Sequence, residues 1–288
     1  MTGQEVRGWL IGTLIALTLV AGANSAVAEP VQLKPSLLRL NANLELPPGR
    51  KISDGVALIL HGTQSHDRQE TIATLQENLK KLGIGSLAIT LSLGIDDRRG
   101  PRACDVLHDY TLAGARREIA AWMAWLRANG AHQVDLIGFS RGGAQIAALA
   151  PKLTPVGHVV MLAPTFATAD EQAEAYQRTY GHPLEGPLEA ARKLPLQKYE
   201  VDFLLCRNSP VLGATFLDGY LELPPSLAAE TDRPTLVIVA GNDEIAPNLA
   251  TRLPAGVQRV VIEGSNHFFP DHFGEQAAAA IAKFLREQ

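Results

Sequence analysis

A serine flanked by glycines is the first feature of this chain that could do chemistry. Ser140 lies at the centre of the sequence GFSRG, directly after a predicted strand at 134–137 and before an alanine-rich stretch. A serine hydroxyl is a good nucleophile only when a base takes its proton, and a tight strand-to-helix turn exposes the hydroxyl to such a base. Gly138 and Gly142 fit this turn, because a Cβ atom at either position would crowd the neighbouring backbone. The pattern predicts that Ser140 is a nucleophile.

Two residues farther along the chain could activate this serine. Asp243 follows the penultimate predicted strand, and His267 follows the last one. Catalytic groups of parallel sheets gather at the carboxyl ends of the strands, so we expect these side chains to meet Ser140. His267 would then act as the base, and Asp243 would orient its ring. Two alternatives stay open: Glu244 could replace Asp243 as the acid, and His267 could be a surface histidine.

Alternating strands and helices are needed to position these groups. Continuous apolar runs predict strands, and apolar residues at helical spacing predict helices between them. The predicted strands are 56–60, 86–93, 134–137, 158–163, 235–240 and 257–262, and the predicted helices are 67–82, 112–128, 142–149 and 272–286. Residues 31–54 predict an extended entry segment or an edge strand. The fold class that follows is α/β, with a mostly parallel central sheet and helices on both faces.

The interval 166–233 breaks this alternation. It is long and polar, with helix-like stretches at 169–180 and 187–194, so it predicts an inserted helical cap rather than a structureless loop. The core would then consist of 29–165 and 234–288. Five aromatic side chains of the cap could line an acyl pocket, although we favour the alternative that they pack the cap onto the core: Tyr176, Tyr180, Phe203, Phe216 and Tyr220.

The first residues predict a secretory signal peptide at 1–28. Arg7 precedes a mostly apolar stretch at 9–23, and Ala-Val-Ala at 26–28 provides a cleavage site after Ala28. The stretch is shorter than the roughly 20 apolar residues that span a bilayer, so an uncleaved anchor is the less favoured alternative. We expect a periplasmic or secreted protein with no stable membrane span in its mature part.

Composition narrows the choice of partners. The 288 residues are 46% hydrophobic and 19% charged, which is enough to bury a large core. The net charge of -4 and the lack of a long basic run argue against nucleic acid binding.

Cys104 and Cys206 could pair in an oxidising compartment or stay free, and the sequence leaves this open. Arg98, Arg99 and Arg102 cluster with Asp96, Asp97 and Asp105 around Cys104. Such mixed charge predicts a solvated loop, and binding of a substrate carboxylate is the less favoured alternative.

In combination, these motifs resemble the α/β-hydrolase family over residues 56–285. The resemblance rests on His-Gly at 61–62 after an early strand, on the turn at Ser140, and on Asp243 and His267 in that chain order. It implies that Ser140 attacks a carbonyl, that His267 transfers the proton and that Asp243 orients the imidazole.

The family resemblance also implies an oxyanion hole and a reaction class. The backbone amides of Thr63 and Arg141 would hold the developing oxyanion, and no metal or organic cofactor would be needed. We expect a small-molecule acyl substrate and cleavage of a carboxylic ester through an acyl-enzyme intermediate. A thioesterase, lactonase, amidase or peptidase would use the same groups, and a non-catalytic ligand-binding protein could keep the same fold. The sequence after His61 departs from the HGGG pattern of lipases, which leaves the acyl preference open.

Overall fold

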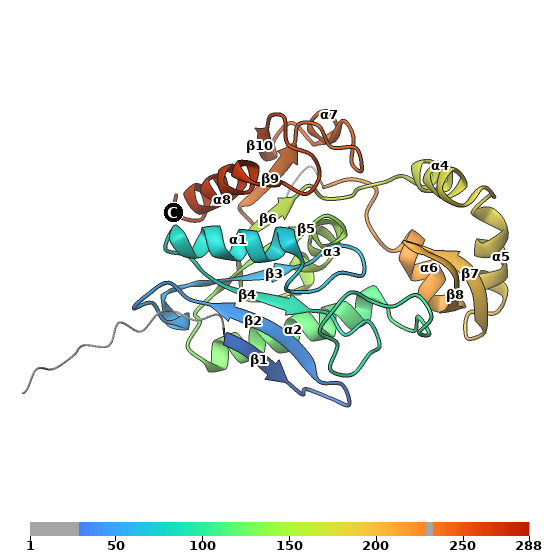
Figure 1. Cartoon of the computed structure of the whole chain (residues 1–288), viewed down its shortest axis with the longest axis horizontal. Helices are drawn as coiled ribbons and strands as arrows, with labels where there is room; N and C mark the ends of the chain where they lie inside the picture. Colours follow the sequence, from blue (N-terminus) through green and yellow to red (C-terminus); the bar gives the residue numbers. More distant parts are fainter. Residues whose placement is uncertain (1–28, 229–232, 288) are drawn as a thin grey trace, which may run out of the picture.

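An eight-stranded sheet forms the centre of the molecule (Figure 1). The computed structural model describes residues 29–228 and 233–287, so the predicted signal peptide lies outside the described residues. The strand order is β1-β2-β4-β3-β5-β6-β9-β10. The strands span Glu29–Leu33 (β1), Leu40–Glu45 (β2), Val56–Leu60 (β3), Gly85–Thr90 (β4), Val134–Phe139 (β5), Val156–Leu162 (β6), Thr235–Ala240 (β9) and Gln258–Ile262 (β10).

The predicted parallel sheet is confirmed from β4 to β10. Strand β3 pairs in parallel with both β4 and β5, and β6 pairs in parallel with β5 and β9. The segment predicted as an extended entry or edge strand forms two strands: β1 pairs antiparallel with β2, which pairs antiparallel with β4. The parallel strands are buried on both faces, which explains why they appear in the sequence as continuous apolar runs.

Helices cover both faces of the sheet, as predicted. The helices of this core span Glu70–Lys81 (α1), Leu112–Ala128 (α2), Arg141–Leu149 (α3), Leu249–Arg252 (α7) and His272–Phe284 (α8), with short 3-10 turns at Ile52–Asp54 and Ala150–Lys152. Neighbouring residues of β3 point to opposite faces: Leu58 packs with α2 and α3, whereas Ile59 packs with α1 and α8. The two layers bring the carboxyl ends of the strands to one edge.

A separate group of elements is inserted between β6 and β9. It comprises Ala169–Tyr180 (α4), Glu185–Lys193 (α5), Lys198–Phe203 (β7), Cys206–Leu212 (β8) and Gly213–Leu221 (α6). This insertion lies beyond the carboxyl ends of the parallel strands, on the right in Figure 1. Besides α4 and α5, which the sequence predicts, it contains the β7-β8 hairpin and α6, which the sequence pattern did not reveal. Tyr176, Phe203 and Phe216 are buried together within it, so these aromatics pack mainly with one another inside the cap.

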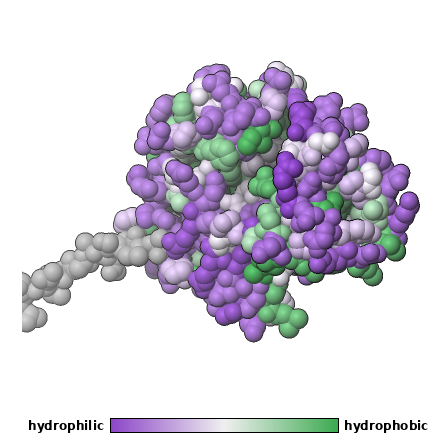
Figure 2. All heavy atoms as spheres, turned by 45° about the vertical axis from the view of Figure 1, so that its right-hand side comes forward, coloured by the Kyte–Doolittle hydropathy of each residue, from purple (hydrophilic) through white to green (hydrophobic). Residues whose placement is uncertain are grey.

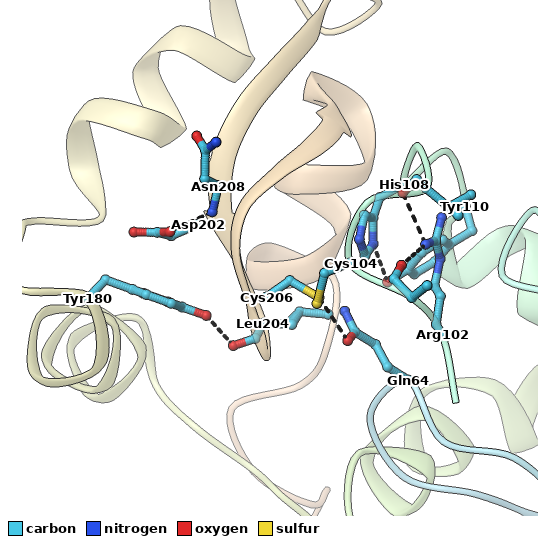
Figure 3. The surroundings of a disulfide bond; sticks show 12 residues. Gln64, Arg102, Cys104, His108, Tyr110, Tyr180, Asp202, Leu204, Cys206 and Asn208 are labelled. Atoms are coloured by element: carbon cyan, nitrogen blue, oxygen red, sulfur yellow. Dashed lines mark hydrogen bonds between the residues drawn. A yellow bond between two sulfur atoms is a disulfide. The ribbon is translucent and has the colours of Figure 1, made fainter. Parts of the chain in front are cut away.

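A disulfide bond joins this cap to the core (Figure 3). Cys104, in the loop that follows β4, is bonded to Cys206 at the start of β8. Backbone hydrogen bonds reinforce the link: the His108 amide donates to Pro210 O at 2.8 Å, and the Leu212 amide donates to His108 O at 2.9 Å. The cysteine question that the sequence leaves open is therefore settled in favour of pairing. Within 29–228 and 233–287, no helix is long and apolar enough to cross a membrane.

Candidate active site

The turn that carries Ser140 is tight and strained. Ser140 joins β5 to α3 with φ 56° and ψ -123°, a backbone conformation that non-glycine residues rarely adopt. A Cβ atom added at Gly138 would lie 2.4 Å from Gly142 O, and one added at Gly142 would lie 2.4 Å from His61 O. Both distances are far below van der Waals contact, so the predicted need for glycine at these two positions is confirmed.

Ser140, His267 and Asp243 form a continuous chain of hydrogen bonds. The Ser140 Oγ lies 2.9 Å from His267 Nε2, and His267 Nδ1 lies 2.8 Å from Asp243 Oδ2. A carboxylate can only accept, so Nδ1 carries the ring proton and Nε2 is free to accept the proton of the serine. His267 is 1% exposed, which makes it a buried residue rather than a surface histidine. The arrangement has the geometry needed to activate a hydroxyl group.

Asp243 is held in place as an ionised carboxylate. Its Oδ1 also accepts the amides of Ile245 at 2.9 Å and Ala246 at 2.8 Å. Burial by itself would raise the pKa of the Asp243 carboxyl, but the hydrogen bonds from His267 and these amides lower it more, so the pKa lies below its ordinary value. Glu244 is exposed, and the structure brings Asp243 rather than Glu244 to the imidazole.

The two predicted oxyanion residues lie on either side of the nucleophile. Arg141 is the first residue of α3, where backbone amides have no acceptor within the helix. Thr63 follows Gly62, and a Cβ atom added at Gly62 would lie 3.2 Å from Ser140 Cβ. The turn at 61–64 is therefore packed directly against the serine. Both amides remain our predicted oxyanion donors.

The buried side chain of His61 holds this turn in place. Its Nε2 lies 3.2 Å from the Leu91 amide and 3.2 Å from the Arg98 guanidinium, and its Nδ1 lies 2.8 Å from Gly62 O. Two donors at Nε2 place the ring proton on Nδ1, which donates to Gly62 O. Burial, and secondarily the Arg98 charge, lowers the pKa of His61 to about 3. The ring is therefore neutral at ordinary pH and holds the turn without transferring protons.

The arginine cluster near Cys104 differs from the prediction. Arg98 and Arg102 are each only 5% exposed, so the expected solvated loop is wrong for these two residues. Arg98 Nε donates to Leu91 O at 2.7 Å, and Arg102 Nε donates to Leu93 O at 3.2 Å. A guanidinium offers five donors, so surrounding carbonyl groups can satisfy it in place of water. Arg99 remains exposed and forms an ion pair with Asp97 at 3.0 Å.

The buried arginine loop is attached to the predicted oxyanion turn. The Arg102 amide donates to Gln64 O at 2.9 Å, and Gln64 Oε1 lies 3.4 Å from Cys206 Sγ. Figure 3 shows Gln64 reaching the disulfide from the core side. The cap hairpin, the disulfide, this loop and the turn next to Ser140 therefore form one connected set of contacts.

A cavity of about 210 Å³ lies where the cap meets the core. Arg141 and Thr165 line it on the core side, and Tyr176, Tyr180 and Tyr220 line it on the cap side. The Thr165 amide donates to Ser140 O at 3.3 Å, so the cavity begins at residues in contact with the nucleophile. Within the described ranges, no three or more His, Cys, Asp or Glu side chains are arranged to hold a metal ion.

A parallel sheet with Ser, His and Asp joined by hydrogen bonds at its carboxyl edge defines the class of the serine-dependent α/β hydrolases. The sequence profile of the Alpha/beta hydrolase family matches residues 57–284. The chain therefore belongs to the alpha/beta hydrolase family. No curated protein matches its sequence.

Solved structures of distant proteins share this fold. Est1E from Butyrivibrio proteoclasticus is 18% identical with a TM-score of 0.63, over 90% of this chain and 98% of that one. The esterase Pf2001 from Pyrococcus furiosus is 15% identical with a TM-score of 0.57, over 91% of this chain and 90% of that one. Alpha/beta hydrolase domain-containing protein 10 from mouse is 17% identical with a TM-score of 0.59, over 90% of this chain and 98% of that one.

Proposed function

We propose that this protein is a serine hydrolase that cleaves carboxylic esters through an acyl-enzyme intermediate. The observation that carries the proposal is the hydrogen-bonded chain from Asp243 through His267 to Ser140. Two structural neighbours support the choice of bond: one is named an esterase, and Est1E has been solved with ferulic acid bound. A small-molecule acyl substrate is also consistent with the size of the cavity between cap and core.

The geometry supports a two-step reaction. Ser140 Oγ attacks the ester carbonyl carbon while His267 Nε2 takes its proton, and Asp243 stabilises the resulting imidazolium. The amides of Thr63 and Arg141 hold the oxyanion, and each such donor typically contributes about 3 to 4 kcal/mol. The tetrahedral intermediate expels the alcohol, which receives the proton from His267. A water molecule then repeats the sequence on the acyl-serine and releases the acid.

Labelling with a fluorophosphonate tests whether Ser140 is activated. We expect a single adduct by intact mass on the wild-type protein and none on Ser140→Ala. Ser36→Ala serves as the matched control, because Ser36 is exposed on the surface, and it should label like wild type. A folded wild-type protein that forms no adduct would refute the enzyme proposal and favour a ligand-binding protein of the same fold.

A screen of substrates separates the remaining hydrolase classes. The kcat/KM values should be compared for an ester, a thioester, a lactone and an amide with matching acyl groups, because the triad is common to all four reactions. We expect the ester to be preferred. A higher kcat/KM for one of the other three would keep Ser140 as nucleophile but reassign the bond.

We also propose that the chain is exported and acts in the periplasm or outside the cell. The charged, apolar and small-residue segments of 1–28 support this, and so does the disulfide, since such bonds persist in oxidising compartments. Fractionation followed by N-terminal sequencing tests it. We expect a mature chain that begins at Glu29, and an unprocessed chain retained in the cytoplasm would contradict the proposal.

A further inference from the structure

The side chain of Arg141 crosses from the nucleophile to the cap. Its backbone belongs to the first turn of α3, next to Ser140, while its guanidinium donates to Gly219 O in α6 at 2.9 Å. It lines the cavity described above and, among the described residues, is the only basic one in that lining. A cation in this position faces a cavity whose lining includes Thr165, the residue hydrogen-bonded to the backbone of Ser140.

The protein neutralises this cation only in part. Among the described residues, Arg141 forms no ion pair; Asp218 is the acid that acts on it electrostatically. Both carboxylate oxygens of Asp218 accept the Leu112 amide, at 2.9 and 2.8 Å, and Asp218 does not line the cavity. Burial lowers the pKa of the Arg141 guanidinium, which still stays protonated at neutral pH. A half-buried cation of this kind is stabilised by an anionic partner.

The rest of the cavity is suited to an apolar group that carries such an anion. The hydroxyl groups of Tyr176 and Tyr180 donate to backbone carbonyls of the cap, and that of Tyr220 accepts the Leu204 amide. Each of these hydroxyl oxygens thus has a partner in the cap, and the three rings present mainly apolar surface to a ligand. Around this region, Figure 2 shows a mostly hydrophilic face interrupted by smaller hydrophobic areas.

The one carboxylate in the lining is already neutralised. Glu171 accepts the Thr168 amide at 2.7 Å and lies 3.0 Å from the Arg252 guanidinium. It therefore adds little negative charge to oppose an incoming anion. The net electrostatic character of the cavity is set by Arg141.

We propose that this cavity binds a carboxylate carried by the substrate and that Arg141 is the residue that recognises it. The ligand class is an ester with a free carboxylate on an aromatic or compact apolar frame, such as the half-ester of an aromatic dicarboxylic acid. A planar guanidinium matches a carboxylate through paired N–H donors, which a neutral ester group cannot replace. The proposal rests on the proposed esterase function, since it names the substrate class of the same site.

A matched pair of esters tests the charge preference. Methyl 4-carboxybenzoate carries the anion, and methyl 4-carbamoylbenzoate is its neutral isostere. Hydrogen bonds to a charged group contribute about 1.5 to 3 kcal/mol, and each 1.4 kcal/mol is tenfold. We therefore expect the wild-type kcat/KM ratio, acid over amide, to be about 10 to 100. Arg141→Gln should bring the ratio close to one, and Arg141→Lys should retain part of it.

The ratio also separates recognition from a bracing role. If Arg141 only holds the cap through Gly219, Arg141→Gln lowers kcat/KM for both esters and leaves their ratio unchanged. Arg178→Gln is the control, because it removes the same charge from an exposed position of α4 outside the cavity. A wild-type ratio near or below one, or a ratio that Arg141→Gln does not change, overturns the proposal.

Binding to Ser140→Ala distinguishes failure of this inference from failure of the esterase proposal. Isothermal titration calorimetry with the two esters should show the acid binding about 10- to 100-fold tighter, and the additional Arg141→Gln change should remove the difference. Charge-selective binding without any hydrolysis by the wild-type protein would retain the carboxylate site and refute the esterase. Hydrolysis without charge preference would retain the esterase and refute the site.

Discussion

Breaking the Cys104–Cys206 disulfide should lower the free energy of unfolding by about 4 to 5 kcal/mol. The bridge joins residues 102 positions apart, and closing a loop of about 100 residues removes roughly 4.7 kcal/mol of chain entropy from the unfolded state. A loss of this size is a large fraction of the total stability of an ordinary domain, which is about 5 to 15 kcal/mol.

The loss should be greatest in the cap and in the turn next to Ser140. Without the bridge, the β7-β8 hairpin is held to the core loop chiefly by the two backbone hydrogen bonds of His108. The same loop contacts the turn at 61–64 through Arg98 and Arg102. We therefore expect amide exchange to rise in β7 and β8 before it rises in the central sheet, and kcat to fall by more than KM changes.

Urea unfolding of Cys104→Ala/Cys206→Ala, compared with oxidised wild type, measures the free energy directly. Wild type treated with a phosphine reductant is the matched control, because it breaks the bond without removing the buried sulfur of Cys206. The two perturbed proteins should lose similar stability. A loss below about 1 kcal/mol, or exchange that rises first in the central strands, would refute the reasoning.

Two further predictions concern the candidate catalytic groups and the turn beside them. Asp243→Asn should lower kcat about 10⁴-fold, by analogy with other triads, while Glu244→Gln changes it little; steady-state kinetics would reverse this assignment if the effects were exchanged. His61 should make the free energy of unfolding decrease as the pH is lowered. Its pKa is about 3 when folded and about 6.5 when unfolded, so the unfolded chain binds the extra proton between these values. This contribution is fully present above pH 6.5 and is lost at up to about 1.4 kcal/mol per pH unit as the pH falls towards 3. Between pH 7 and 5, wild type should therefore lose about 2 kcal/mol more than His61→Gln in urea unfolding, and equal losses would show that His61 is not held neutral.

Local patterns in the sequence determined the core of this fold. The helix predicted at 112–128 has the bounds of α2, because Ile119, Trp122 and Met123 recur at helical spacing and are all buried. The strand predicted at 235–240 likewise has the bounds of β9, whose residues are buried almost throughout. Such elements can be predicted because burial of one face gives apolar residues at helical spacing, and burial of both faces gives a continuous apolar run.

The residues around Ser140 were also accessible to sequence reasoning, for a topological reason. In a parallel sheet the carboxyl ends of the strands share one edge, so groups that follow β5, β9 and β10 come together even though they lie far apart in the chain. Chain order and strand context were therefore enough to predict Ser140, Asp243 and His267, although the choice between Asp243 and Glu244 needed the structure. The steric need for glycine at positions 138 and 142 follows from the same turn.

Only the tertiary structure decided what joins the cap to this site. Pairing of Cys104 with Cys206 depends on the separation of two loops, for which the sequence contains no local signal. Arg98 and Arg102 lie close to acidic residues in the sequence, as surface residues do, yet they are buried because the folded loop places carbonyl groups around them in place of water. The cavity at Arg141 likewise arises from surfaces of cap and core that meet only after folding. Contacts between distant segments depend on how close the folded chain brings them, and the periodicity of neighbouring residues does not reveal that distance.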